Sequence, residues 1–152
     1  MTRAYDGRMA LRKRKKRVLA FGVFDRIHAG HRFFLRSARA LDGELFVAVA
    51  RDRNVLRLKK KRPRDSEQTR LRNIRRAPAV SGAFLGDKKD GDYAVLRKIK
   101  PDIVCVGYDQ TSLRSDILQK IKAGVIPKIP IIRIRAYRPK ILHTSILKKI
   151  IL

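Results

Sequence analysis

The sequence predicts a single α/β domain built on a mainly parallel, five-stranded sheet. Short apolar runs alternate along the chain with segments of helical periodicity, which is the pattern of strands joined by crossover helices. The length of 152 residues suits one domain. No apolar run approaches the ~18 residues of a membrane span.

The first three elements follow from apolar patterning. Val18–Phe21 is a short apolar run, and we expect it to be the first buried strand. A helix is expected over His31–Leu41, because apolar residues recur at i, i+4 and i+7 from Phe34. The continuous apolar run Leu45–Ala50 is typical of a parallel strand covered on both faces.

The next stretch changes in composition. Arg51–Ser66 is polar, basic and interrupted by Pro63, so we expect a loop. A helix is expected over Ser66–Arg76, followed by a short strand over Ala83–Leu85 that Gly86 closes.

Another helix and strand follow in the same alternating order. Tyr93–Ile99 has the pattern of a helix, and Pro101 ends that segment because proline cannot continue a helix. Ile103–Val106 is a short apolar strand closed by Gly107.

The last third of the chain completes the sheet. Ser112–Lys122 fits a helix that stops near Gly124. Ile131–Ile134 is expected to be the fifth strand, and Pro130 at its start indicates a sheet edge. Thr144–Leu152 is expected to form a terminal helix.

The net charge of +26 predicts attraction to polyanions such as nucleic acids and nucleotides. The densest basic runs are Arg12–Arg17 and Lys59–Arg62. We interpret residues 1–16 as a basic flexible arm suited to non-specific polyanion binding, and residues 17–152 as the folded domain. The alternative is a solvated basic surface without a specific partner.

Cysteine use indicates a reducing compartment. The single cysteine, Cys105, lies within an apolar run and is expected to be buried and structural. The charged N-terminus has no following apolar h-region or small-residue cleavage site, so a secretory signal is not expected. We therefore expect a cytoplasmic protein.

One motif points to phosphate chemistry. Directly after the first strand the chain reads Gly22-Val23-Phe24-Asp25-Arg26-Ile27-His28-Ala29-Gly30-His31. Two histidines flank an Ala-Gly pair at the start of a helix, where free backbone N–H groups and the helix dipole favour an anion. Imidazoles can donate hydrogen bonds to phosphoryl oxygens, and Gly30 permits close approach to the backbone.

A second motif is expected at the same edge of the sheet. Gly107-Tyr108-Asp109-Gln110 follows the strand Ile103–Val106. Ligands of parallel sheets bind beyond the carboxyl ends of the strands, at the point where the strand order reverses. We therefore predict that the histidine motif and Asp109 line one site.

These motifs resemble those of the cytidylyltransferase-like nucleotidyltransferase family, whose signature is G-T-F-D at a strand end followed by H-x-G-H. The resemblance extends from Val18 to the C-terminus. Further landmarks recur in order: Ala50-Arg51-Asp52, Glu67-Gln68-Thr69-Arg70, Gly86-Asp87, Lys100-Pro101-Asp102-Ile103, Gly107-Tyr108-Asp109-Gln110 and His143-Thr144-Ser145. The pattern is most similar to archaeal-type FAD synthetases, and next to glycerol-3-phosphate cytidylyltransferases.

The resemblance implies a Rossmann-like, doubly wound fold and transfer of a nucleoside monophosphate from a nucleoside triphosphate. A phosphate oxygen of the acceptor would attack the α-phosphorus in line, and pyrophosphate would leave without a covalent enzyme intermediate. It further implies Mg²⁺ or another divalent cation with the triphosphate, and a homodimer in many members. ATP and FMN are the favoured substrates; a CTP donor with glycerol 3-phosphate is the alternative.

The resemblance and the motifs together give a set of candidate site residues. The candidate catalytic residues are His28, His31, Lys60 and Arg138, with Lys60 favoured among the adjacent lysines Lys59, Lys60 and Lys61. The candidate nucleotide-binding residues are Gly22, Val23, Phe24, His28, Ala29, Gly30, His31, Asp109, Tyr137, Thr144 and Ser145. No protein residue is assigned as a metal ligand.

Several candidates have a purely structural alternative. The histidine pair could cap the helix, Asp109 could be an N-cap, and Lys60 could be one of a solvated run of lysines. Phe24 and Tyr137 could belong to the core, and Thr144 and Ser145 could simply cap the last helix.

Three departures from the family pattern concern the acceptor pocket more than the triphosphate site. Val23 replaces the usual threonine, His143 replaces the first serine of the last turn, and Pro139–Ile141 does not match the usual T-x-G. The net charge of +26 and the basic arm favour an alternative of another class, a basic nucleic-acid-binding protein on a degenerate nucleotidyltransferase fold.

Overall fold

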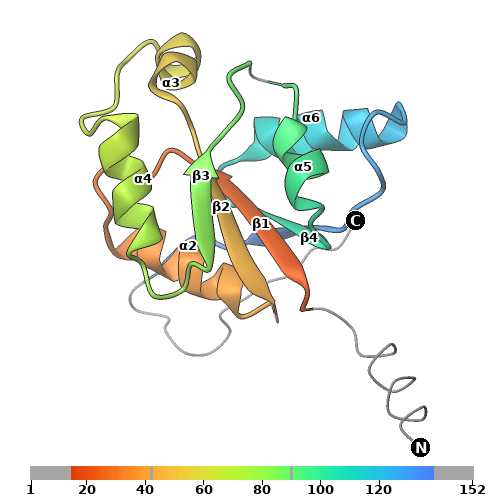
Figure 1. Ribbon diagram of the computed structural model, residues 1–152, viewed down its shortest axis with the longest axis horizontal. Helices are drawn as coiled ribbons and strands as arrows, with labels where there is room; N and C mark the ends of the chain where they lie inside the picture. Colours follow the sequence, from red (N-terminus) through yellow and green to blue (C-terminus); the bar gives the residue numbers. More distant parts are fainter. Residues whose placement is uncertain (1–14, 42, 90, 139–152) are drawn as a thin grey trace, which may run out of the picture.

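Five parallel strands form one sheet in the computed structural model, which describes residues 15–41, 43–89 and 91–138 (Figure 1). The strands are β1 (Arg17–Gly22), β2 (Glu44–Val49), β3 (Gly82–Leu85), β4 (Ile103–Gly107) and β5 (Ile131–Ile134). Their order is β3-β2-β1-β4-β5, and every neighbouring pair runs parallel. This confirms the predicted doubly wound sheet and the edge position of β5.

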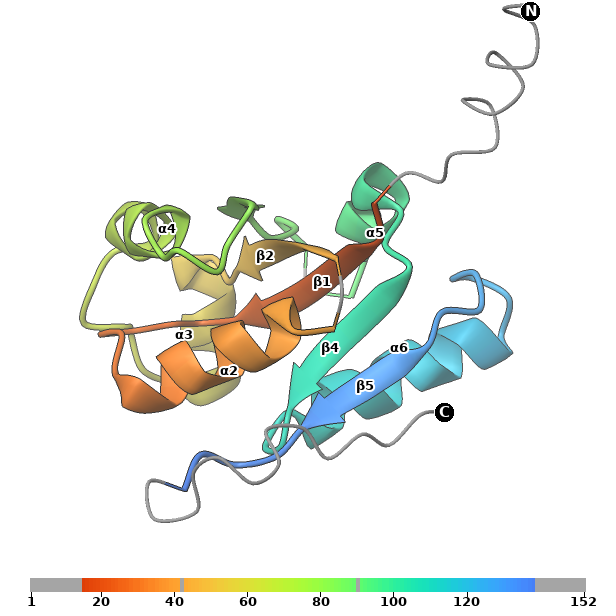
Figure 2. The same ribbon diagram turned by 90° about the horizontal axis from the view of Figure 1, so that it is seen from below.

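Four of the five helices in the described part of the chain cover the two faces of this sheet. The helices are α2 (Ala29–Arg39), α3 (Asp52–Lys59), α4 (Glu67–Arg75), α5 (Ala94–Ile99) and α6 (Thr111–Lys122). Buried residues of α2 and α4 pack on one face, and those of α5 and α6 pack on the other. Helix α3 lies beyond the arrowheads of the strands, at the carboxyl end of the sheet (Figures 1 and 2).

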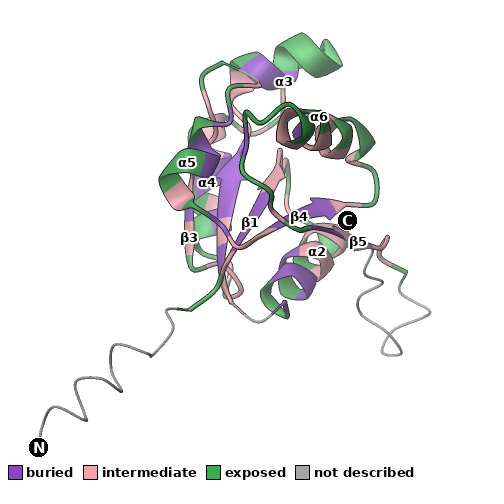
Figure 3. Cartoon of the chain, turned by 90° about the vertical axis from the view of Figure 1, so that its right-hand side faces the viewer, coloured by how far each residue is buried: buried purple, intermediate pink, exposed green. Residues whose placement is uncertain are grey.

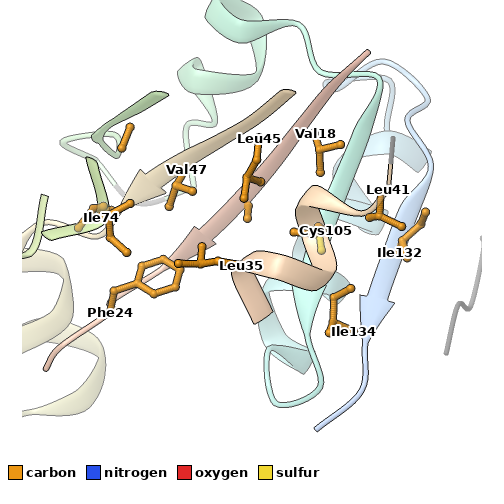
Figure 4. Close-up of a cluster of buried hydrophobic side chains, with 14 of the residues drawn as sticks. Val18, Phe24, Leu35, Leu41, Leu45, Val47, Ile74, Cys105, Ile132 and Ile134 are labelled. Atoms are coloured by element: carbon orange, nitrogen blue, oxygen red, sulfur yellow. The ribbon is translucent and has the colours of Figure 1, made fainter. Parts of the chain in front are cut away.

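The sheet is buried because side chains alternate between two apolar layers. In β1, Val18 and Ala20 join the layer under α2 and α4, whereas Leu19 joins the opposite layer. Leu35 of α2 packs into the first layer, which Figure 4 shows together with Cys105. Figure 3 shows the buried strands between the more exposed outer sides of the helices. A fully buried leucine of this kind contributes roughly 1.5–3 kcal/mol.

The prediction of a loop over Arg51–Ser66 was wrong for its first half. Helix α3 occupies Asp52–Lys59, with Asn54 and Val55 buried. Few apolar residues mark its periodicity, because its outer face is charged. Only the segment after Lys60, where the chain adopts a left-handed conformation with φ of 59°, is irregular as expected.

The other helix predictions agree with the structure to within two residues. Helix α2 begins at Ala29, two residues before the predicted start. The expected terminal helix over Thr144–Leu152 and nearly all of the basic arm lie outside the described residues. Within the described part of the chain, no helix combines the length and apolar character that a bilayer crossing requires.

A fully buried arginine joins the loops at the carboxyl end of the sheet. Arg70 on α4 has no exposed surface. One terminal nitrogen, Nη1, donates to the carbonyls of Val23 and Ala50, which follow β1 and β2, at 2.8 Å each. Its Nε donates to the carbonyl of Asp65 at 3.1 Å, and its Nη2 pairs with the carboxylate of Asp52 at 2.6 Å. The guanidinium fork can satisfy all four acceptors at once.

The start of α3 is tied to the start of α4 by a reciprocal pair of hydrogen bonds. The Glu67 carboxylate accepts from the Asp52 N–H at 2.8 Å, and the Asp52 carboxylate accepts from the Glu67 N–H at 3.2 Å. Each acid thereby satisfies a free N–H group in the first turn of the other helix. These hydrogen bonds therefore hold helix α3 in place over the carboxyl end of the sheet.

Replacing Arg70 with lysine should lower the free energy of unfolding by about 2–4 kcal/mol, because lysine cannot reach four acceptors in the fork geometry. Urea unfolding followed by circular dichroism measures the loss. Arg76→Lys, at an exposed position just after α4, is the matched control and should change stability by less than about 0.5 kcal/mol. Equal losses in the two variants would contradict the role of Arg70.

Candidate functional site

A cavity of about 950 Å³ opens at the carboxyl end of the sheet. Residues of both sequence motifs line it, which confirms the prediction that the histidine motif and Asp109 lie at one site. The predicted residues among its lining are Gly22, Val23, Phe24, His28, Ala29, Gly30, His31, Asp109 and Tyr137.

The two histidines form a capping box at the start of α2. His28 is the N-cap residue, and its Nδ1 accepts from the Gly30 N–H at 3.1 Å. The Nδ1 of His31 accepts from the His28 N–H at 3.3 Å. The two rings stack with centroids 3.8 Å apart. The pair does cap the helix, as the structural alternative proposed, but capping uses only one nitrogen of each ring.

This pattern fixes which ring nitrogen carries hydrogen. A nitrogen that accepts a hydrogen bond carries no proton, so the ring N–H lies on Nε2 in both His28 and His31. Two parallel imidazoles at the positive end of a helix therefore each retain one N–H donor. That arrangement suits oxygens of a polyanion.

Burial and the neighbouring ring keep His31 neutral. Burial lowers the pKa of the His31 imidazole, and the nearby His28 lowers it further, to about 4. The carboxylates of Asp25 and Asp109 act in the opposite direction but do not reverse the shift. At neutral pH His31 is thus an uncharged hydrogen-bond donor.

The glycine between the histidines leaves room for the cap. A Cβ on Gly30 would lie 3.0 Å from Cε1 and 3.2 Å from Nδ1 of His28. A side chain at this position would therefore press on the His28 ring and require it to shift by a few tenths of an ångström. Gly30 therefore sets the position of His28, in addition to the close ligand approach that the sequence suggested.

The turn before α2 has a strained backbone, and hydrogen bonds from the segment before α4 hold it in place. Phe24 and Arg26 both have φ of 53°, a left-handed conformation that costs non-glycine residues about 1–3 kcal/mol. The Asp25 carboxylate accepts from the backbone N–H groups of Arg64 and Asp65 at 2.7 and 2.9 Å. Phe24 itself is buried, so its assignment to the core is confirmed, although it also lines the cavity.

The second motif is tied to the first across the sheet. Gln110 donates from Nε2 to the carbonyl of Phe21 at 2.9 Å, and its Oε1 accepts from the Gly107 N–H at 2.8 Å. This side chain joins the end of β1 to the end of β4, the two strands at which the sheet order reverses. Asp109, which directly precedes Gln110, is exposed at the cavity.

The structure favours Lys59 over Lys60 as the lysine at the cavity. Lys59 lines it, whereas Lys60 is the exposed C-cap of α3 and does not. Arg138 is likewise exposed and does not line the cavity, whereas Arg135 and Tyr137 do. Tyr137 also packs on the ring of Phe33, with centroids 5.4 Å apart.

Part of the predicted site lies outside the described residues. Thr144, Ser145 and the departure at His143 all belong to that segment. Their predicted contacts with phosphate stay predictions.

Several residues that also line the cavity were not among the candidate site residues, and they include Arg51, Asn54, Asp87 and Tyr93. Arg51 and Asp87 occur among the family landmarks quoted above, which could have indicated them. Asn54 lies in the segment predicted to be a loop. Tyr93 has φ of 51° just before α5, a backbone strain that its residue type does not reveal.

Within the described part of the chain, no group of three or more His, Cys, Asp or Glu side chains is placed to hold a metal ion. The carboxylates that do line the cavity are those of Asp87 and Asp109. Asp87 is already engaged by the N–H groups of Ala94 and Val95, at 2.8 and 3.2 Å.

Comparison with known proteins gives a consistent group of relatives. The sequence matches the family described as cytidylyltransferase-like over residues 19–150. It is 42% identical over 137 residues to the FAD synthase of Methanosarcina mazei, covering 89% of this chain and 88% of that protein. It is 41% identical over 121 residues to the FAD synthase of Aciduliprofundum boonei, covering 80% of this chain and 79% of that protein.

Solved structures show the same fold. A lipopolysaccharide core biosynthesis protein from Thermoplasma volcanium superposes with a TM-score of 0.74 and 37% identity, covering 82% of this chain and all of that one. Pantoate-beta-alanine ligase from Francisella tularensis gives a TM-score of 0.55 at 14% identity, covering 88% of this chain and 64% of that one. The second likeness is one of fold alone.

An NMR titration of the imidazole carbons should place the midpoint of His31 near pH 4. The unfolded chain binds this proton at about pH 6.5, so between the two values the unfolded state holds more protons than the folded state. The free energy of unfolding should therefore fall as pH drops from about 6.5 to about 4.

The variant His31→Asn keeps a side-chain acceptor for the His28 N–H and removes the titrating ring. Its melting temperature should fall less between pH 7 and pH 5 than that of the unchanged protein. A His31 midpoint near its ordinary value would contradict the half-buried, neutral ring.

Proposed function

The chain belongs to the cytidylyltransferase-like family, and we propose that it transfers the adenylyl group of ATP to FMN, forming FAD and releasing pyrophosphate. It is an FAD synthetase-like nucleotidyltransferase by its similarity to several archaeal FAD synthases. The identities of ATP as donor and FMN as acceptor are the proposal. Glycerol-3-phosphate cytidylyl transfer from CTP remains the runner-up.

The observation that carries the proposal is the histidine pair at the start of α2, inside a cavity that Asp109 also lines. In nucleotidyl transfer, negative charge moves onto the oxygens around the α-phosphorus and onto the leaving pyrophosphate. Donors held in advance at the places where charge develops are worth more than donors that must reorient. The Nε2–H groups of His28 and His31 are such donors, because their other nitrogens are locked in the cap.

The reaction needs positioning rather than covalent chemistry. An FMN phosphate oxygen attacks the α-phosphorus of ATP, the new P–O bond forms as the bond to the β-phosphate oxygen breaks, and pyrophosphate takes the electron pair. Holding the two reacting groups in line can supply much of the rate. The helix dipole at Ala29 and Gly30 would favour the triphosphate at the same point.

The size and lining of the cavity support binding of the proposed substrates. Its volume lies near the upper end of the roughly 300–1,000 Å³ found for ligand pockets. Tyr137, which follows β5, and Phe33 of α2 offer aromatic surface that suits the adenine. On the α3 side, Val55 and the exposed Leu58 offer apolar surface for the flavin ring.

We propose that the divalent cation enters with the triphosphate. Enzymes of this family generally use a metal with the nucleotide, and the described residues contain no preformed cluster of ligands for one. Magnesium is commonly held by one or two carboxylates together with substrate phosphates. Asp109, exposed at the cavity, could supply such a carboxylate or a hydrogen bond through metal-bound water.

We propose that the protein works in the cytoplasm. Cys105 is fully buried, and burial raises the pKa of its thiol to about 12. A thiol of this kind stays protonated and unreactive, as expected for a structural cysteine in reducing surroundings.

Replacing His28 with asparagine should reduce pyrophosphate release from ATP and FMN on the order of 10²-fold, because one preorganised donor is lost. Asparagine is a good N-cap residue, so the helix should remain stable. Pyrophosphate and FAD are measured in parallel, and Arg36→Gln, exposed on α2 and outside the cavity lining, serves as the control. A fully active His28→Asn enzyme would remove this histidine from the mechanism.

The same assay tests the substrates. The unchanged protein is incubated with ATP or CTP and with FMN or glycerol 3-phosphate, with Mg²⁺ and with Mn²⁺. We expect product from ATP and FMN. Product from CTP and glycerol 3-phosphate alone would replace the proposal with the runner-up, and four silent mixtures would remove both.

Replacing the two lysines at the end of α3 should change the KM for ATP to different extents. Lys59→Met should raise the KM for ATP about tenfold, because a cavity-lining ammonium would lose its contact with the β- or γ-phosphate. Lys60→Met, which removes the same charge outside the cavity lining, should change KM less than twofold. Steady-state kinetics at fixed FMN measures both, and a larger effect at position 60 would reverse the assignment.

A further inference from the structure

Arg51 is a cationic residue of the large cavity and follows the second strand. It comes two residues after β2 and is the N-cap residue of α3, and its half-buried side chain lines the cavity. Its Nε donates to the carbonyl of Gly86, which directly follows β3, at 2.8 Å. The guanidinium group therefore bridges the ends of two neighbouring strands.

The hydrogen bond to Gly86 fixes the Arg51 guanidinium through one nitrogen only. Among the described residues, none forms a hydrogen bond or an ion pair with Nη1 or Nη2 of Arg51. The nearby carboxylate of Asp87, which also lines the cavity, accepts instead from the backbone N–H groups of Ala94 and Val95. Two N–H groups on one edge of a guanidinium match two oxygens of a phosphate. Arg51 can therefore hold a phosphate group in the cavity and keep its bond to Gly86.

The segment that begins with Arg51 turns one side of a helix toward the cavity. Its cavity-lining residues are spaced i, i+3, i+4, i+7 and i+8, and they are Arg51, Asn54, Val55, Leu58 and Lys59. This spacing marks one face of an α-helix. With a rise of 1.5 Å per residue, Leu58 lies about 10 Å along the axis from Arg51. A cation at the sheet is thus followed by apolar side chains, an order that matches a ligand with a phosphate at one end and an apolar ring at the other.

Arg51 also lies next to the start of the histidine motif. Ala50, directly before Arg51, donates its N–H to the carbonyl of Gly22, the last residue of β1, at 2.9 Å. In the strand order β3-β2-β1-β4-β5, Arg51 lies on the β2–β3 side of that motif, whereas Asp109 and Tyr137 follow β4 and β5 on the other side. An acceptor phosphate at Arg51 and a nucleoside at Tyr137 would therefore meet at the histidines.

We propose that Arg51 binds the phosphate monoester of the acceptor, and that it thereby selects phosphorylated acceptors over their unphosphorylated counterparts. This inference rests on the proposed function, because it names the group that holds the attacking substrate. The N–H groups on Nη1 and Nη2 pair with two phosphate oxygens and leave the third to attack the α-phosphorus. The positive charge also reduces the repulsion between the acceptor phosphate and the triphosphate, two anions that must come into contact.

The test measures binding of substrates to the full-length protein rather than turnover. FMN and riboflavin are titrated by calorimetry with Mg²⁺ and α,β-methylene ATP present, because the methylene bridge prevents release of pyrophosphate. We expect FMN to bind the unchanged protein about tenfold or more tightly than riboflavin. In Arg51→Gln, the dissociation constant of FMN should rise about tenfold or more, whereas that of riboflavin should change less than about threefold.

Two further variants separate the phosphate contact from other effects. Arg53→Gln removes the same charge from an exposed position on α3 outside the lining of the large cavity, and it should change the dissociation constant of FMN less than about twofold. Arg51→Lys keeps the charge without the fork, so its loss should be smaller than that of Arg51→Gln. Equal weakening of FMN in Arg53→Gln would reduce the effect to overall charge and overturn the proposal. Riboflavin weakened as much as FMN in Arg51→Gln would also overturn it, because Arg51 would then only support the cavity wall.

The remaining outcomes distinguish this inference from the proposed function. If Arg51→Gln weakened α,β-methylene ATP as much as FMN, the guanidinium would serve the triphosphate and the inference would be wrong. If Arg51→Gln bound FMN as tightly as the unchanged protein, the inference would fail and the proposed function would stand. If the unchanged protein bound glycerol 3-phosphate but not FMN, and Arg51→Gln lost that binding, the role of Arg51 would stand and FMN would be the wrong acceptor. Binding of neither acceptor would overturn both.

Discussion

The buried guanidinium of Arg70 is the interaction on which the carboxyl end of the sheet depends. It satisfies the carbonyls of Val23 and Ala50, which follow two neighbouring strands, and it pairs with Asp52 at the start of α3. An unpaired buried charge would be costly, so these four acceptors and the arginine require one another. The left-handed backbone at Phe24 costs free energy, and the hydrogen bonds of Arg70 to the surrounding loops offset that cost.

The protein's own hydrogen bonds set the geometry of the histidine site, so it does not depend on a ligand. The helix start supplies N–H groups that need acceptors, and His28 and His31 meet part of that need with one nitrogen each. The same bonds orient the other nitrogen of each ring. Capping and the proposed catalytic role are therefore not competing explanations for this motif, because capping fixes the ring orientation that the proposed role requires.

Sequence predicted the sheet and the central motif well because their signals are local. Apolar runs such as Val18–Phe21 mark buried strands directly, and the spacing of His28, Gly30 and His31 is fixed within one helical turn. Helix α3 was missed because its buried face consists of only a few side chains, including the polar Asn54. The favoured Lys60 lies just past the helix end, a difference of one residue that only the turn geometry decides.

The buried thiol of Cys105 has a practical consequence. It is the only cysteine in the chain, and its raised pKa keeps it from forming the thiolate that alkylating reagents attack. A cysteine introduced at an exposed position such as Leu58 or Tyr108 would thus be the sole reactive sulfur in the folded protein. Maleimide dyes or spin labels could then be attached at the rim of the large cavity without first removing the native residue.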